Sequence, residues 1–167
     1  MFINHFKSQL AKSDEERQKA TEKRGRQADW VAETLKQRYG PDLRGGDFVV
    51  LGDFNADRTA DELQSLLRLP GLENIVQTRS LKIPGQGVVT ESDRWTHYFD
   101  GDKTTSQLDY VLLSPNLAER SAQEDVIIEK RGLADYVKVY AGDRFPGVGP
   151  SGTEASDHCA VFTTLHL

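Results

Sequence analysis

Residues 48–57 read FVVLGDFNAD, an apolar run that ends in a glycine and is followed at once by Asp53, Phe54 and Asn55. The apolar run is typical of a buried β-strand, which would therefore present two short, oxygen-bearing side chains at its carboxyl end. This is the edge at which α/β sheets bind ligands. Aspartate suits a hard cation such as Mg²⁺, and asparagine can hydrogen-bond a phosphoryl oxygen without adding charge. Taken alone, however, Asp and Asn after a strand are more often turn formers.

The composition limits the class of protein. The 167 residues, 37% of them hydrophobic, predict one domain that spans residues 1–167. The net charge of −5 argues against a broadly cationic surface that binds nucleic acid by neutralising phosphates alone. The single cysteine, Cys159, excludes an intramolecular disulfide framework and a Cys-rich zinc cluster. No apolar run approaches the roughly 18 residues of a membrane span, no signal peptide is recognisable, and the compartment stays open.

The hydrophobic pattern mixes helices with strands and predicts an α/β or α+β layer fold. Each expected helix begins with a capping box, Ser13 with Glu16 in one and Thr59 with Glu62 in the other. The charged first half of the longer helix predicts a solvated or frayed segment. Trp30 and Trp95 are expected in the core, Cys159 is expected to be buried, and residues 142–156, rich in Gly and Pro, predict a surface loop. We expect helices at 13–39 and 59–69 and strands at 2–6, 48–51, 95–99, 107–113, 126–129 and 158–167.

Three further polar clusters lie at the ends of predicted strands. Asp157 and His158 come directly before a strand and provide a carboxylate for a metal and an imidazole that can act as a base near neutral pH. Asp109 begins an apolar strand, where it could accept a hydrogen bond from an imidazole and fix its tautomer. His5 and Lys7 follow another strand and offer a general acid or phosphate ligand and a cation.

Each cluster also has a purely structural explanation. The histidines could be satisfied core residues, and Asp109 could cap a turn. His97 is equally compatible with packing and with lining a substrate site. Four polar clusters at strand edges are nevertheless much less expected by chance than any one of them. Together they favour a single site at one edge of the sheet.

Four motifs carry a resemblance to a known family. They are NHFKS at 4–8, GDFN at 52–55, LDYVL at 108–112 and SDH at 156–158. In this order they resemble the endonuclease/exonuclease/phosphatase superfamily, whose members have the fold of DNase I. The resemblance implies a two-sheet β-sandwich flanked by helices and hydrolysis of a phosphate ester by in-line attack of water. It covers nearly the whole chain.

The resemblance also implies a role for each motif residue. Asp53 would bind Mg²⁺ or Mn²⁺ or orient the attacking water, and Asp157 would be a further metal ligand. His158 would act as general base or phosphate ligand, oriented by Asp109. The remaining expected contacts with the phosphate come from His5, Asn55 and Lys7. This chemistry fits the residues, because a cation neutralises charge on the phosphoryl oxygens while a His–Asp pair transfers the proton.

One departure from the family pattern concerns the beginning of the chain. The family's N-terminal half supplies an Asn after its first strand and a metal-binding Glu, and neither motif precedes Phe2. We therefore expect the chain to correspond to the C-terminal portion of such a domain, lacking its N-terminal half. On this reading it binds metal weakly and has little activity unless a partner completes it. An incomplete sheet would also favour self-association.

The expected function is thus hydrolysis of phosphodiesters, with nucleic acid as the leading substrate. A phosphatase or phospholipase-type esterase that acts on inositol phosphates or phospholipids is the enzymatic alternative. A non-catalytic fragment that folds or associates is the alternative from another class. The motifs do not separate these substrates, because their groups act on the phosphate that all of them share.

Overall fold

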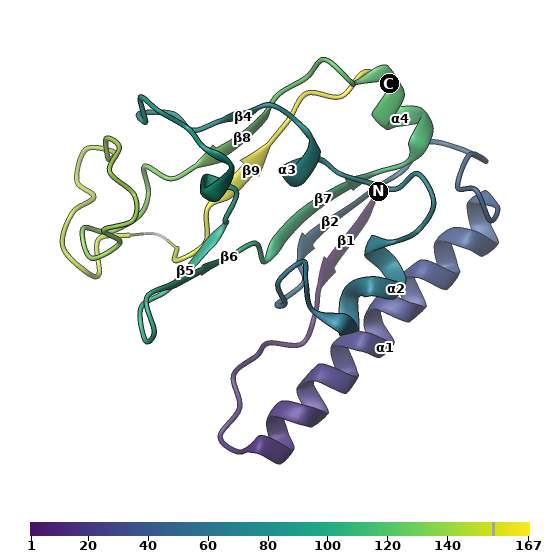
Figure 1. The fold of residues 1–167 in the computed structure, drawn as a ribbon, viewed down its shortest axis with the longest axis horizontal. Coiled ribbons are helices and arrows are strands. Elements are labelled where there is room, and N and C mark those ends of the chain that lie inside the picture. The colour runs from purple at the N-terminus through teal and green to yellow at the C-terminus, as the bar shows by residue number, and fades with distance from the viewer. Residues whose placement is uncertain (155) are drawn as a thin grey trace.

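The computed structural model describes residues 1–154 and 156–167, and a four-stranded sheet packed on a long helix lies at its centre (Figure 1). The strand order is β1-β2-β7-β3, with β1 parallel to β2 and both β2 and β3 antiparallel to β7. This mixed arrangement confirms the α/β class. The four strands are β1 (Phe2–His5), β2 (Val49–Asp53), β3 (Glu73–Asn74) and β7 (Asp109–Leu113).

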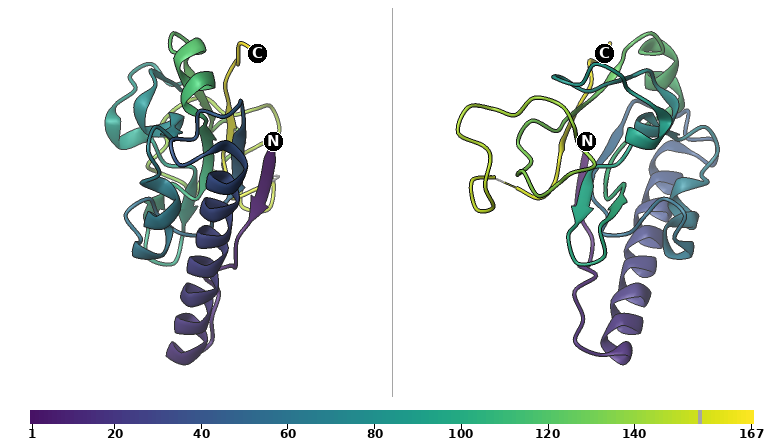
Figure 2. Two further views of the ribbon diagram at one scale, coloured as in Figure 1. Left: turned by 90° about the vertical axis from the view of Figure 1, so that its right-hand side faces the viewer. Right: turned by 60° about the vertical axis from the view of Figure 1, so that its left-hand side comes forward.

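Helix α1 (Asp14–Tyr39) confirms the longer predicted helix, including its start. The Ser13 side chain accepts a hydrogen bond from the backbone N–H of Glu16, which caps the first turn. The apolar stripe of α1 packs against the buried face of β2 and β7. Both views in Figure 2 show α1 on one side of the sheet. The stripe consists of Ala28, Val31, Ala32 and Leu35.

The first half of α1 is mostly exposed, as predicted for a solvated segment, but it is a regular helix and not frayed. The helix continues through Gly25, and the guanidinium of Arg24 is buried. Arg24 donates hydrogen bonds to Glu62 at 2.9 and 3.1 Å, and the bare Cα of Gly25 faces the Cβ of Glu62. A long-range ion pair therefore anchors a segment that local sequence alone describes as surface.

The second predicted helix is shorter than expected. It consists of a 3-10 turn η1 (Asp61–Leu63) followed by α2 (Gln64–Leu67). The predicted capping box is wrong, because Thr59 donates to the carboxylate of Asp57 while Glu62 pairs with Arg24. Leu63 and Leu66 still pack into the same core as α1.

A second group of strands covers the other half of the molecule. The three-stranded sheet has the order β4-β8-β9, and β5 pairs with β6 as a hairpin. Their apolar side chains form a second core with Trp95, Leu113 and Cys159. The elements are α3 (Ile75–Thr78), β4 (Leu81–Lys82), η2 (Glu91–Asp93), β5 (His97–Phe99), β6 (Thr104–Ser106), α4 (Pro115–Arg120), β8 (Val126–Glu129) and β9 (Ala160–Phe162).

Several local predictions need correction. Trp30 is 71% exposed and not in the core, whereas Trp95 and Cys159 are buried as expected. Of the predicted strand at 158–167, only Ala160–Phe162 is a strand. The described residues of 142–156 contain neither helix nor strand, as predicted, and residue 155 lies outside them. The short strands β3, β4 and β6 were not expected, since two or three residues leave too short a pattern to recognise.

Two features of the surface bear on what the chain can bind. Strand β1 lies at the edge of its sheet in the described part of the chain, and the side chain of Ile3 is exposed there. No helix among the described residues combines the length and the apolar composition needed to cross a membrane.

Candidate active site

Strand register assembles three of the expected site residues in one row. His5 pairs with Asp53 across β1 and β2, and Asp53 pairs with Asp109 across β2 and β7. Paired residues project to the same side of a sheet, so the three side chains share one face. The Nε2 atom of His5 lies 3.7 Å from the carboxylate of Asp53. Motifs separated by about fifty residues along the chain thus meet at one end of the sheet.

Gly52 makes this row possible. Its φ of +133° lies in the region that favours glycine, and it pairs with Asn4 in the neighbouring strand. A Cβ atom at this position would lie 1.8 Å from the carbonyl oxygen of Asn4. The glycine of the GDFN motif therefore allows β1 to approach β2 closely enough to bring His5 beside Asp53.

Asn55 holds Asp53 in place through two hydrogen bonds. Its backbone N–H donates to one carboxylate oxygen at 2.7 Å, and its side-chain Nδ2 donates to the other at 2.9 Å. The same Nδ2 donates to the carbonyl of Phe6 at 3.2 Å. These bonds accompany a left-handed backbone conformation, φ 51°, which Asn tolerates better than other non-glycine residues. Asn55 is thus a positioning residue here.

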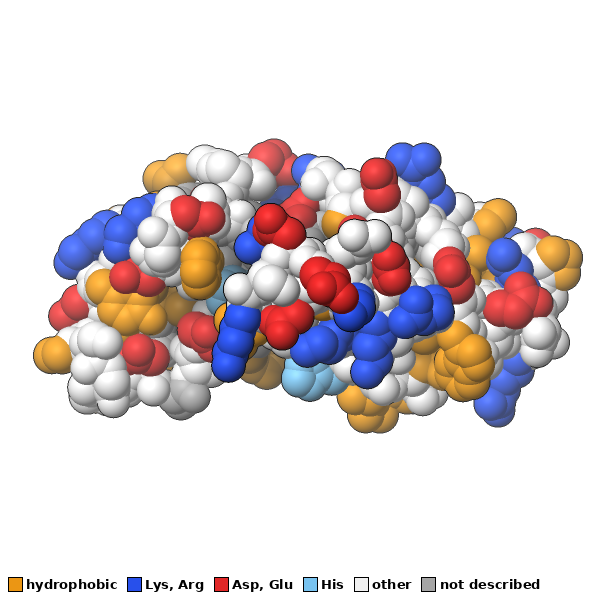
Figure 3. All heavy atoms as spheres, turned by 90° about the horizontal axis from the view of Figure 1, so that it is seen from below, with side chains coloured by type: hydrophobic (Ala, Val, Ile, Leu, Met, Phe, Trp, Pro, Cys, Tyr) orange, Lys and Arg blue, Asp and Glu red, His pale blue; other side chains and the backbone are white. Residues whose placement is uncertain are grey.

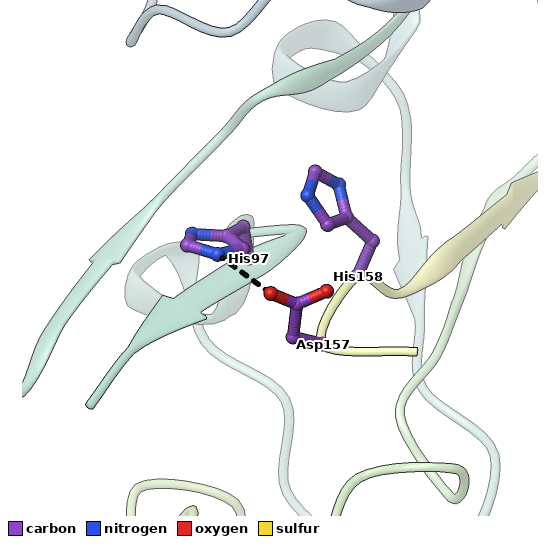
Figure 4. Close-up of side chains that lie close together, drawn as sticks. All are labelled: His97, Asp157 and His158. Atoms are coloured by element: carbon purple, nitrogen blue, oxygen red, sulfur yellow. Dashed lines mark ion pairs between the residues drawn. The ribbon is translucent and has the colours of Figure 1, made fainter. Parts of the chain in front are cut away.

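His158 reaches the row from the segment before β9. Its Nδ1 lies 2.8 Å from the carboxylate of Asp109, which is the His–Asp pair expected from the sequence. The neighbouring Asp157 is largely exposed and lies 3.5 Å from Nε2 of His97 (Figure 4). The rings of His97 and His158 have centroids 4.7 Å apart.

Thr96 is a positioning residue that the sequence reasoning missed. Its fully buried hydroxyl oxygen accepts hydrogen bonds from the backbone N–H groups of Leu108 and Asp109, both at 3.0 Å. Its carbonyl accepts the N–H of Cys159 at 2.6 Å. Thr96 therefore fixes the start of β7, which carries Asp109, and the segment before β9, which carries His158. The signal in the sequence was the polar residue between Trp95 and His97 in an otherwise aromatic strand.

An aromatic stack supports the site from beneath. Phe54 is fully buried between Phe6 and Tyr110, at centroid distances of 4.6 and 4.5 Å and with nearly parallel rings. The Tyr110 hydroxyl donates to the carbonyls of Ala56 and Gln107. The Phe of GDFN and the Tyr of LDYVL are thus structural partners, which explains aromatic residues inside motifs that otherwise carry polar groups.

The environment shifts the pKa values of the site residues in different directions. Burial raises the pKa of the Asp53 carboxyl, the hydrogen bond from Asn55 opposes this, and the nearby charge of Asp109 adds to the rise. The hydrogen bond to Asp109 raises the pKa of His158. Burial and the charge of His158 lower the pKa of His97. Of the two adjacent imidazoles, His158 is therefore protonated first on acidification.

Two groups of described side chains could hold a metal ion. One contains Asp53, Asp109 and His158 and the other His97, Asp157 and His158, with the ligand atoms of each group within 4.8 Å of one another. The residues fit a divalent cation, because each group brings carboxylate oxygens and imidazole nitrogens together on part-buried or exposed side chains. The two expected metal ligands, Asp53 and Asp157, belong to different groups that share His158.

His5 and Lys7 lie at the periphery. The His5 side chain is 75% exposed, and Lys7 is exposed on the segment that follows β1. The backbone of Lys7 is held by α1, since its N–H donates to Gln27 and its carbonyl accepts from Arg24. The phosphate-binding role expected for Lys7 stays a prediction.

The sequence of residues 5–158 matches the model of the endonuclease/exonuclease/phosphatase family. The chain belongs to this family. The match covers all four motifs except Asn4 of the first, and it confirms the resemblance recognised in the sequence. No curated protein sequence matches the chain.

Solved structures are similar to this family member at low sequence identity. A 3'-5' exonuclease from Neisseria meningitidis is 16% identical with a TM-score of 0.50, over 99% of this chain and 60% of that one. An endonuclease/exonuclease/phosphatase from Bacteroides vulgatus is 16% identical with a TM-score of 0.50, over 88% of this chain and 45% of that one. A sphingomyelinase C from Streptomyces griseocarneus is 20% identical with a TM-score of 0.48, over 77% of this chain and 41% of that one. The chain thus spans 41–60% of the length of these proteins.

Proposed function

We propose that this family member is a metal-dependent phosphodiesterase that hydrolyses nucleic acid with Mg²⁺ or Mn²⁺. The observation that carries the proposal is the juxtaposition of the Asp109–His158 hydrogen bond with the Asp53 carboxylate on one face of the sheet. Metal-assisted hydrolysis needs a base to accept the proton of water and a carboxylate to bind the metal ion. His158 and Asp53 provide these two groups side by side. Family membership supports the same reaction class.

The side chains divide the work by their chemistry. His158, with Nδ1 held by Asp109, presents Nε2 as the base that removes a proton from the attacking water. Asp53, fixed by Asn55, would supply a carboxylate to a cation in the group with Asp109, and Asp157 would supply one in the group with His97. The cation, when bound, stabilises negative charge on the phosphoryl oxygens. His5 is exposed at the end of the row, where it can donate a proton or a hydrogen bond to a phosphate oxygen.

Nucleic acid is favoured as substrate by the surface next to His5. A groove of about 470 Å³ between β1 and α1 is lined by His5, Lys23, Arg26 and Trp30. Figure 3 shows Lys and Arg side chains gathered beside an exposed histidine on the face seen from below. Cationic side chains that neutralise a backbone, with an exposed indole on which a base can stack, are typical of single-strand binding. Lys23 and Arg26 supply positive charge at this groove although the net charge of the chain is −5.

A non-catalytic role is the second candidate. The observation that favours it is that the chain spans 41–60% of the length of the three solved proteins described above. On this alternative the chain folds and presents the motif residues but does not turn over substrate unaided.

Cleavage assays with defined substrates test the proposal. The chain is incubated with Mg²⁺ or Mn²⁺ and plasmid DNA, single-stranded oligonucleotides, a generic phosphodiester, a phosphomonoester, an inositol phosphate or sphingomyelin. We expect metal-dependent cleavage of nucleic acid that is lost in Asp53→Ala and His158→Ala but retained in His166→Ala, a matched control outside the site.

Each other result points elsewhere. Hydrolysis of the phosphomonoester or the inositol phosphate alone would assign the chain as a phosphatase instead of a nuclease. Hydrolysis of sphingomyelin alone would assign it as a phospholipase-type esterase. No turnover of any substrate by folded protein would leave the non-catalytic role.

A further inference from the structure

His97, Asp157 and His158 form a compact cluster with nitrogen and oxygen donors. One ligand atom of each lies within 4.8 Å of the other two, and Figure 4 shows the three side chains grouped between β5 and the segment before β9. The sequence around His97 is equally compatible with packing and with lining a substrate site. Its position beside two motif residues indicates a role in the site.

The main chain fixes the two imidazoles relative to each other. His97 and His158 form an antiparallel bridge, and the N–H of Cys159 donates to the carbonyl of Thr96 at 2.6 Å. Thr96 and Cys159 are buried in the core. Asp157 is 63% exposed at its side chain, so it can rotate toward a ligand without disturbing this frame.

Asp109 prepares His158 for binding through its other nitrogen. The carboxylate lies 2.8 Å from Nδ1, which leaves the lone pair of Nε2 free for a ligand. A carboxylate that orients a histidine in this way is the usual outer partner of a metal-binding imidazole. His97 lies 3.5 Å from Asp157 through Nε2 and shares the cluster.

We propose that His97, Asp157 and His158 bind a divalent transition metal ion such as Zn²⁺, Co²⁺ or Ni²⁺, with water completing the coordination. Two imidazoles and one carboxylate suit these metals, whereas Mg²⁺ prefers oxygen ligands throughout. The group with Asp53 and Asp109 is the oxygen-rich counterpart. Because the lone pair of His158 serves one ion at a time, occupation of the two groups is mutually exclusive at this residue.

The inference rests on the proposed function, because it assigns a second type of metal to the same site, and an ion bound to Nε2 of His158 would occupy the lone pair that the proposed base uses. Its test measures binding without substrate. The metal-free chain is titrated with Co²⁺, and the visible absorption of the bound ion is recorded. We expect one Co²⁺ per chain, displacement by Zn²⁺ but not by equimolar Mg²⁺, and at least a roughly tenfold loss of affinity in His97→Ala.

Control variants separate ligation from folding. His166→Ala removes a histidine that contacts Glu124 away from the cluster and should bind Co²⁺ like the native chain. His97→Gln keeps a polar side chain of similar reach and should lose affinity with an unchanged circular dichroism spectrum. If native protein shows no Co²⁺ absorption, or if both His97 variants bind as tightly as native protein, the inference is overturned.

The binding result and the cleavage result are distinguishable. Co²⁺ binding that depends on His97, in a chain that cleaves no substrate, supports the metal site and removes the proposed hydrolysis. Mg²⁺-dependent cleavage without His97-dependent Co²⁺ binding supports the proposed hydrolysis and rejects the metal site at His97.

Discussion

At the scale of single residues, the Asp109–His158 hydrogen bond sets the protonation behaviour of the site. This bond is the largest cause of the raised pKa of His158, and the charges of Asp53 and Asp157 act in the same direction. A raised pKa means that protonated His158 stabilises the folded state below the unfolded-state value of about 6.5. That contribution is lost as the pH rises through the higher folded-state pKa. Hydrolysis that needs neutral His158 should therefore increase over the same interval.

Asp109→Asn should lower the pKa of His158, because it removes the negative charge that favours the imidazolium. The acid limb of the pH–rate profile should move to lower pH, although the rate falls because the base is less well oriented. An NMR titration of the His158 ring protons measures the shift directly. Glu124→Gln, next to His166, is the matched carboxylate control. An unchanged titration midpoint in Asp109→Asn would refute this account of the pair.

At the scale of elements, the site depends on how closely two parallel strands approach each other. Gly52→Ala should destabilise the fold by at least ~2 kcal/mol, because the new Cβ meets the Asn4 carbonyl at 1.8 Å and the backbone has φ +133°. Gly132→Ala is the control, since a Cβ there has no neighbour within 4 Å. Urea denaturation of both variants gives the comparison. Equal midpoints for the two would show that β1 can move away from β2 without cost.

The ion pair between α1 and η1 makes a second prediction about elements. Glu62→Ala removes the carboxylate that pairs with the buried guanidinium of Arg24. The free energy of unfolding should fall by ~3–5 kcal/mol, as expected when a buried pair is broken. Glu15→Ala breaks an exposed pair with Lys19 and should cost less than ~1 kcal/mol. Thermal unfolding at matched pH compares the two. Similar losses would mean that the Arg24 pair is screened like a surface pair.

At the scale of the whole molecule, β1 has an unpaired outer edge in the described structure. Its Ile3 side chain is 70% exposed, and an exposed apolar edge strand favours pairing with another copy. We expect concentration-dependent dimers in sedimentation velocity experiments and a shift toward monomer in Ile3→Lys. Val88→Lys, a change at an exposed loop residue, should leave the dimers intact. A monomeric native chain at high concentration would exclude self-association through this edge.

The sequence by itself determined the parts of this protein that depend on local pattern. The periodicity and cap of α1, the strand that ends in GDFN and the strand that begins at Asp109 are short-range features, and all three predictions are confirmed. The family followed from the order of the motifs, which needs no coordinates. Trp30 shows the limit of this reasoning, because amino-acid type predicts burial only on average.

Only the tertiary structure decided which side chains meet. Strand register placed His5, Asp53 and Asp109 in one row, and pairing between distant segments set His97 beside His158. The buried Arg24–Glu62 pair and the Thr96 hydrogen bonds likewise join segments far apart in the chain. These contacts depend on long-range packing that no local pattern encodes. The sequence therefore predicted the chemistry of each residue, whereas the tertiary structure determined which residues come together in a site.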